Sequence, residues 1–219
     1  MHVSRLEGCN VSKMALSDRF PAFPYGMEST SNRGELLHLI AIAVPFNLCK
    51  IGRMLSVAPL TSSDIAEIVA AFVVFGWGGK DRAQYEGYLL EQDAGVRDVL
   101  VARTENDFAG YVTWRSDYPP FRDSNIPEVH DLNVLPQDRR KHIGTRLMDE
   151  AERLISPRSP VVGIGVGLHS DYGAAQRFYV WPGYVPDARG ITSHGTRVGY
   201  GDVVSADDDL VLWLIRNLS

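Results

Sequence analysis

The sequence predicts an α/β (α+β) domain in which a mixed β-sheet is covered by helices. Segments with strand-like and helix-like patterns alternate from Met54 to the end of the 219-residue chain. Two neighbouring strand-like segments are joined by a short polar turn, as in an antiparallel hairpin. Hydrophobic residues make up 45% of the chain and charged residues 22%, so the chain has enough apolar side chains to build a core.

The first predicted elements are a short strand over 56–59 and a helix over about 62–74. Ser62 or Ser63 can cap this helix. Its apolar residues recur at helical spacing: Ile65, Ile68, Val69 and Phe72. A glycine-rich loop over 76–79 precedes a second helix over 83–92, which carries Tyr85, Tyr88 and Leu89 on one side.

Strands over 96–103 and 108–114 flank a polar turn and form the hairpin. A polar, proline-containing loop follows, and a further strand is expected over 128–134. An amphipathic helix is predicted over 144–155, with Leu147, Ala151, Leu154 and Ile155 on one face.

The last predicted elements are a glycine-containing strand over 161–167, a short helix over 173–180 and an apolar strand over 209–216. The strand over 161–167 has glycine at every second position, but it does not lead into a helix as a dinucleotide-binding fingerprint does. Glycine in such a strand more often permits a bulge or the close approach of a ligand or backbone.

The first 53 residues differ from this pattern, because Ser, Pro, Gly and Asn interrupt them every few positions. We interpret 1–53 as a loosely ordered N-terminal extension or a non-native start, and 54–219 as the functional domain. The apolar stretch over 36–49 lies far from residue 1 and contains Pro45, which argues against a signal peptide.

The composition excludes several classes of function. Acidic residues outnumber basic ones by 27 to 22, which disfavours nucleic-acid binding as the main role. No apolar run reaches the roughly 20 residues of a membrane span. The two cysteines, Cys9 and Cys49, exclude a disulfide framework and a CxxC zinc site. We expect a cytoplasmic protein with no metal and with no membrane or nucleic-acid partner.

The segment over 128–148 carries the clearest chemical signal. A strand leads into Pro136, three basic residues follow (Arg139, Arg140 and Lys141), and Gly144 and Thr145 open a helix. The first N–H groups of a helix have no internal partner and sit at the positive end of its dipole, so they bind anions. Gly144 allows a close backbone approach, and the basic side chains can add charge-assisted hydrogen bonds. The segment is not a Walker A loop.

This segment, LNVLPQDRRKHIGTRLMDEAE, resembles motif A of the GNAT superfamily of acetyl-CoA-dependent N-acetyltransferases. That motif has Arg or Gln, then Gly three residues later, then Gly or Ala two residues after that. Arg139 and Gly144 match, whereas His142 replaces the first glycine. A second segment, DYGAAQRFYVWPGYVPD, resembles motif B through Ala175, Phe178, Tyr179, Gly183 and Tyr184. The resemblance covers about residues 55–218.

The resemblance implies a mixed, mostly antiparallel sheet that is splayed at strand four and flanked by helices. It implies that acetyl-CoA is the co-substrate and enters this splay. The backbone of Leu132, Asn133 and Val134 would bind the pantetheine arm. The amides of His142, Ile143, Gly144 and Thr145 would hold the pyrophosphate beside Arg139, Arg140 and Lys141. Since His142 keeps the backbone amide of the glycine that it replaces, we expect that the chain still binds the coenzyme.

Acetyl transfer needs a neutral amine and a proton for the leaving thiolate. In histone-acetylating members of the family a glutamate at the matching strand position is the base, so Glu128 is the first choice. Asp131 is the alternative base, acting through water, or a structural partner of a nearby arginine. His130 is a weaker candidate for a proton relay. A bulge, common in this strand of the family, would change which of these side chains share a face.

Tyr179 matches the family tyrosine that gives a proton to the coenzyme thiolate, and a phenol is protonated at neutral pH. Tyr172 stands where many members have Asn, and we expect Trp181 and Tyr184 to be packing residues. Trp114, Tyr118, Phe121 and Arg122 are candidates for acceptor contacts, together with Trp77 and Tyr85.

The predicted function is therefore direct transfer of an acetyl group to a primary amine in a ternary complex. The domain over 54–219 contains no cysteine, so an acetyl-cysteine intermediate is excluded there. A small-molecule amine is the first choice of acceptor. The alternatives are a protein amine (Lys or N-terminal) and a non-catalytic acyl-CoA sensor. The family resemblance also allows a homodimer.

Overall fold

The computed structural model describes residues 54–117 and 121–219. The predicted N-terminal extension and the candidate acceptor residue Tyr118 lie outside these residues. In the described part of the chain, no helix is long and apolar enough to cross a membrane.

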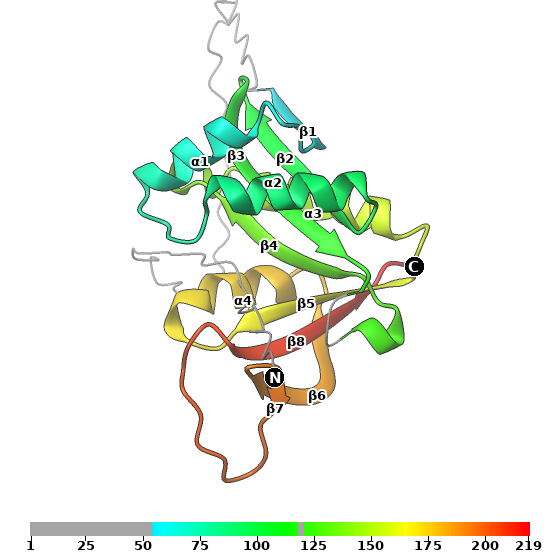
Figure 1. Ribbon diagram of the computed structural model, residues 1–219. Helices are drawn as coiled ribbons and strands as arrows, with labels where there is room; N and C mark the ends of the chain where they lie inside the picture. The colour runs from blue at the N-terminus through cyan, green and yellow to red at the C-terminus, as the bar shows by residue number, and fades with distance from the viewer. Residues whose placement is uncertain (1–53, 118–120) are drawn as a thin grey trace, which may run out of the picture. The chain divides into compact units, whose positions relative to one another are not determined.

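The described residues form one mixed sheet of eight strands in the order β1-β2-β3-β4-β5-β8-β6-β7 (Figure 1). Neighbouring strands are antiparallel except β4 and β5, which are parallel. The strands are β1 (Leu55–Pro59), β2 (Arg97–Thr104), β3 (Asp107–Arg115), β4 (Glu128–Val134), β5 (Val161–Gly167), β6 (Val185–Ser193), β7 (Thr196–Arg197) and β8 (Leu210–Asn217). The predicted fold class is confirmed.

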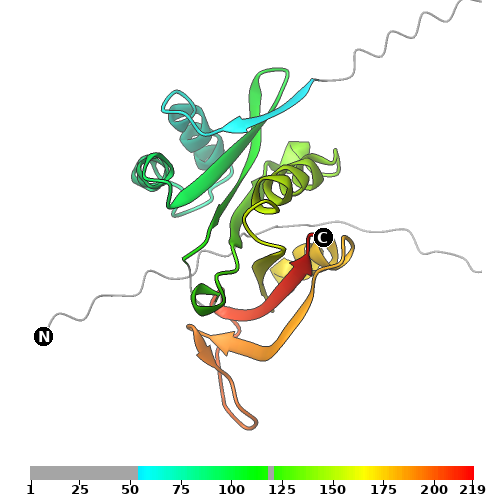
Figure 2. The ribbon, with the colours of Figure 1, turned by 90° about the vertical axis from the view of Figure 1, so that its right-hand side faces the viewer.

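Four α-helices pack on this sheet in the described part of the chain: α1 (Ile65–Val74), α2 (Arg82–Asp93), α3 (Ile143–Ile155) and α4 (Gly173–Val180). Figure 2 shows α1 and α2 on one side of the sheet and α3 on the other. Alternation along β2 explains the two layers. Val99 and Val101 pack with the residues of α1 and α2, whereas Leu100 and Ala102 pack in the larger cluster with α3.

The start of α1 differs from the prediction. Asp64, not Ser62 or Ser63, is its N-cap residue. The Asp64 carboxylate accepts hydrogen bonds from the Thr61 amide at 2.7 Å and the Thr61 hydroxyl at 2.6 Å. The turn before α1 is therefore stabilised by the aspartate rather than by a serine cap.

The sheet opens between β4 and β5. Each of these strands has seven residues, yet only Glu128 and Val129 pair with β5, opposite Gly163 and Ile164. Beyond Val129 the two strands diverge, which confirms the predicted splay at strand four.

The glycines of β5 make room for aromatic side chains. A Cβ on Gly163 would lie 2.4 Å from Phe121, one on Gly165 would lie 2.7 Å from Trp213, and one on Gly167 would lie 2.5 Å from Tyr172. The close approach expected from the glycine pattern therefore involves aromatic rings of this chain.

Candidate active site

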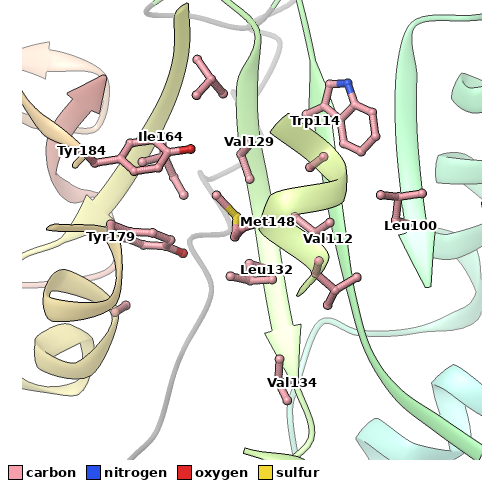
Figure 3. Close-up of a cluster of buried hydrophobic side chains, with 14 of the residues drawn as sticks. Leu100, Val112, Trp114, Val129, Leu132, Val134, Met148, Ile164, Tyr179 and Tyr184 are labelled. Atoms are coloured by element: carbon pink, nitrogen blue, oxygen red, sulfur yellow. The ribbon is translucent and has the colours of Figure 1, made fainter. Parts of the chain in front are cut away.

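A pocket lies where β4 and β5 diverge, and its walls come from β4, β5, the turn before α4, and α4. Its lining residues are Glu128, Val129, His130, Asp131, Ile164, Gly165, Val166, Tyr172, Ala175 and Tyr179. Figure 3 shows Tyr179 reaching from α4 toward β4, where Val129 and Leu132 lie. The fold therefore brings the two predicted catalytic residues, Glu128 and Tyr179, to one pocket.

Glu128 is the first residue of β4, and it is only 1% exposed. Its Oε1 atom lies 3.5 Å from Nδ1 of His130. Its Oε2 atom is buried without a hydrogen-bond partner among the described residues. Burial raises the pKa of Glu128 above its usual range, against the lowering effect of His130. A carboxylate with a raised pKa is a stronger general base near neutral pH.

Tyr179 lies on α4 and is 4% exposed. Burial, together with the negative charge of Asp131, raises the pKa of its hydroxyl group. In the part of the chain that the structure describes, this hydroxyl makes no side-chain hydrogen bond. Tyr179 is therefore a protonated phenol at neutral pH with its proton available to a group in the pocket.

A β-bulge changes the direction of β4 in the middle of the strand. Tyr111 pairs with Asn133 and Thr113 pairs with His130, so Asp131 and Leu132 together oppose Val112. Asp131 has φ of +57°, a conformation that aspartate tolerates better than most residues. The anticipated bulge is present.

The Asp131 carboxylate is fully buried and ion-paired with Lys80. It also accepts hydrogen bonds from Tyr111, from Tyr88 at 3.0 Å and from Asn133 at 2.8 Å. Burial alone raises its pKa, but the Lys80 ammonium and the hydrogen bonds offset this, so the pKa of Asp131 lies below its usual range. The partner is thus a lysine rather than the expected arginine, and the carboxylate is a poor proton acceptor.

The loop before α3 depends on two left-handed residues. After a short 3-10 turn (Pro136–Asp138), Arg140 has φ of +59° and His142, the N-cap of α3, has φ of +62°. Glycine adopts this conformation freely, whereas another residue pays roughly 1–2 kcal/mol. The backbone conformation therefore accounts for the glycine that the family pattern has at 142.

The N-terminus of α3 is available to an anion. His142 makes no side-chain capping hydrogen bond, so the first N–H groups of the helix keep their hydrogen-bonding capacity. His142 and Thr145 are exposed, whereas Ile143 and Gly144 are buried. A Cβ on Gly144 would meet Phe178 at 3.5 Å and Val134 at 3.6 Å, so this glycine packs the helix closely and does not clear a path for a ligand.

The three basic residues of this loop differ in their surroundings. Lys141 donates a hydrogen bond to Asp138 at 2.8 Å, and Arg140 is exposed. Arg139 is half-buried, and its Nε donates to the Val134 carbonyl at 3.2 Å. Its Nη2 atom is buried without a partner among the described residues, so the guanidinium retains an unused donor.

Comparison with known proteins identifies the family. A model of the acetyltransferase (GNAT) family matches residues 63–180, more than half of the chain. The chain belongs to this family. It is therefore an acyltransferase, as the two motifs predicted.

Individual GNAT relatives agree with this assignment. An uncharacterized N-acetyltransferase of Archaeoglobus fulgidus is 31% identical over 102 residues, which are 46% of this chain and 67% of that protein. An N-acetyltransferase structure from Staphylococcus aureus covers 76% of this chain and 99% of its own, with a TM-score of 0.58 and 14% identity. The structure of an aminoglycoside 6'-N-acetyltransferase solved with coenzyme A matches 75% of this chain and 97% of its own chain, with a TM-score of 0.55 and 14% identity. The two structures show a shared fold.

The predicted acceptor residues that the structure describes differ in their burial. Trp114 is 3% exposed and Phe121 is 2% exposed, so both pack in the core, and their contact with the acceptor stays a prediction. Arg122 is exposed and donates to the Asp117 carbonyl at 2.7 Å. The two predicted packing residues also differ: Tyr184 is buried, but Trp181 is 93% exposed.

Several polar residues of the GNAT site escaped the sequence analysis. Lys80, Gln84, Tyr88 and Tyr111 converge on Asp131 from the α1–α2 loop, α2 and β3. Gln84 and Tyr88 stand four residues apart, which places them on one face of a helix. That spacing was the one sequence signal that these polar residues could act together. Lys80 gave no such signal, because lysine is almost never fully buried unless it is paired.

Proposed function

We propose that this GNAT protein transfers an acetyl group from acetyl-CoA directly to a primary amine of a small molecule in a ternary complex. The observation that carries the proposal is the meeting of Glu128 and Tyr179 in one pocket at the β4–β5 splay. One side chain is a carboxylate with a raised pKa and the other is a protonated phenol with a lowered acidity. Together they meet the two proton requirements of aminolysis of a thioester.

The residues around the splay suit acetyl-CoA. The pantetheine arm would lie along the backbone of Leu132, Asn133 and Val134, where β4 has left β5. The pyrophosphate would bind the amides of 142–145 at the uncapped N-terminus of α3, beside Arg139, Arg140 and Lys141. The unpartnered Nη2 of Arg139 gives this site a donor for a phosphate oxygen. When bound, acetyl-CoA supplies the activated acetyl group.

In this mechanism Glu128 removes a proton from the acceptor ammonium, directly or through water, and so makes the nitrogen nucleophilic. The C–N bond then forms as the C–S bond breaks. Tyr179 donates its proton to the departing thiolate and recovers it from solvent. General acid–base catalysis of this kind contributes about 10²- to 10⁴-fold for each group.

The test is the release of free coenzyme A thiol over a panel of small amines, with both substrate concentrations varied. We expect intersecting initial-velocity patterns, as a ternary complex requires. Tyr179→Phe should lower kcat, whereas Tyr184→Phe, which removes another buried hydroxyl, should leave it near that of the wild type. Tyr184 bonds to Glu152 at 2.9 Å and does not line the pocket. Tight acetyl-CoA binding without turnover of any amine, including protein amines, would support a sensor instead.

A further inference from the structure

The Lys80 side chain lies in a cage of acidic and aromatic groups on β3, β4 and α2. The cage consists of Asp131, Tyr111, Tyr88, Tyr85 and Gln84. The Lys80 ammonium pairs with Asp131, donates to the Tyr111 hydroxyl at 3.0 Å and lies 5.6 Å from the centre of the Tyr111 ring. A carboxylate and the faces or hydroxyls of tyrosines are the groups that recognise an alkylammonium ion.

The cage has more hydrogen-bonding capacity than Lys80 uses. Oε1 of Gln84 is buried and has no partner among the described residues. Tyr85 is 1% exposed and packs edge-on against Tyr111, with ring centres 5.6 Å apart. Buried polar groups are nearly always hydrogen-bonded in folded proteins, so this orphaned acceptor beside the Asp131 carboxylate points to an absent donor.

The cage adjoins the catalytic pocket through the bulge of β4. Asp131 lines that pocket together with Glu128 and Tyr179, and its charge reaches the Tyr179 hydroxyl, whose pKa it raises in addition to burial. Glu128 stands three residues before Asp131 in β4, and both residues line this pocket. One small molecule bound in the pocket would therefore lie beside both residues.

Lys80 enters the cage from the loop that joins α1 to α2. It follows Gly79, with φ of +75°, and Gly76 in the same loop has φ of +65°. A Cβ on either glycine would meet no atom within 4 Å, so the loop is not packed tightly at these two points. Two side chains anchor this loop: Lys80 is buried in the cage, and Trp77 stacks on Phe72 with ring centres 5.1 Å apart.

We propose that this cage is the subsite that binds an ammonium group of the acceptor, and that Lys80 fills it in the free protein. The ammonium held there is an anchor and not the nucleophile, because Asp131 is a poor proton acceptor whereas Glu128 is a good one. The acceptor is therefore a short aliphatic diamine or a larger molecule with two such amino groups. This proposal rests on the proposed function, because the bound amine is an acceptor only if the protein transfers an acetyl group to it.

The first experiment measures binding without catalysis. Replacing Lys80 by Ala should lower the midpoint of thermal unfolding, and n-butylammonium chloride should restore several degrees beyond an equal concentration of sodium chloride. The same salt should not stabilise the wild type, the Lys80→Ala/Asp131→Asn variant, or Lys141→Ala, a control lysine paired with Asp138. If n-butylammonium chloride raises the unfolding midpoint of Lys80→Ala and of the double variant equally, or raises neither, the proposal that the cage binds an ammonium group is wrong.

A second readout uses the wild type, in case Lys80→Ala does not fold. Amide hydrogen exchange of residues 75–81 should increase when 1,4-diaminobutane is added, because the ligand displaces Lys80. Exchange that is unchanged at saturating diamine would contradict displacement.

The third readout connects the cage to acetyl transfer. The wild type should use 1,4-diaminobutane with a KM at least tenfold lower than that for n-butylamine, as expected for one added charge-assisted hydrogen-bonded contact. Asp131→Asn should abolish this preference. If no amine is turned over while the thermal response persists, the acetyl-transfer proposal fails and the cage stands as an ammonium site. If monoamines and diamines are used equally, the anchor role is wrong.

Discussion

Replacing Lys80 by Met leaves the buried Asp131 carboxylate without its cation while it keeps most of the side-chain volume. Lys80 and Asp131 have side-chain exposures of 7% and 0%, so water cannot replace the missing partner. Breaking a buried ion pair in this way costs about 3–5 kcal/mol. For a domain of this size that corresponds to a fall of about 6–20 °C in the midpoint of thermal unfolding.

The stability that Lys80→Met loses should depend on pH. The pKa of Asp131 is lowered in the folded protein, so the pair contributes its full stability above the ordinary aspartate pKa. That contribution disappears as the pH falls through the folded value. In Lys80→Met the burial remains and the cation is gone, so the pKa of Asp131 rises. The deficit of the variant relative to the wild type should therefore be largest near pH 7 and shrink as the solution is acidified.

The assay is urea or thermal unfolding of the wild type, Lys80→Met, Asp131→Asn and the double variant at pH 7 and pH 4. The double variant should be more stable than Lys80→Met at pH 7, because it no longer buries an unpaired charge. A loss below about 1 kcal/mol for Lys80→Met, well short of the range for a broken buried pair, would show that Lys80 does not stabilise a buried Asp131 carboxylate. A deficit that does not change with pH would show the same.

Three further predictions concern the pocket, β5 and the α3 loop. Glu128→Gln should remove the acidic limb of the pH–rate profile, which in the wild type should lie above the ordinary glutamate pKa because burial raises it; a limb that persists in the variant would assign it to another group. Gly163→Ala, whose Cβ would lie 2.4 Å from Phe121, should lose about 1–3 kcal/mol of unfolding free energy, whereas Gly144→Ala should be nearly neutral. His142→Gly should gain about 1 kcal/mol by relieving a left-handed residue and should retain acetyl-CoA binding; a loss of stability would contradict the strain argument.

Local patterns were sufficient for most of the sheet and for the helix that follows the basic loop. The alternation in β2 and β3 and the apolar stripe of α3 lie within single elements, so they are visible in the sequence. The strand β6 (Val185–Ser193) was missed from the residue pattern. Most of its residues are exposed or half-buried, and Ala188 and Gly190 have positive φ at a break in its pairing with β8.

Side-chain surroundings were predictable only where a motif fixed them. Glu128 and Tyr179 are 51 residues apart in the sequence, and both line the pocket at the splay. Phe121 was expected near the acceptor because it is aromatic and lies in a loop, but the glycine at 163 gives it a place in the core. The pairing of Lys80 with Asp131 depends on a bulge and a tertiary contact, neither of which has a short-range sequence signature.

The role of Glu128 as the general base is tested most directly by the rate of coenzyme A thiol release by Glu128→Gln at saturating acetyl-CoA and amine. We expect a kcat about 10²- to 10⁴-fold below that of the wild type, with an unchanged dissociation constant for acetyl-CoA. We also expect that the rate of the variant no longer decreases when the pH falls below the pKa of Glu128. A variant that turns over within a few-fold of the wild type across this pH range would contradict it.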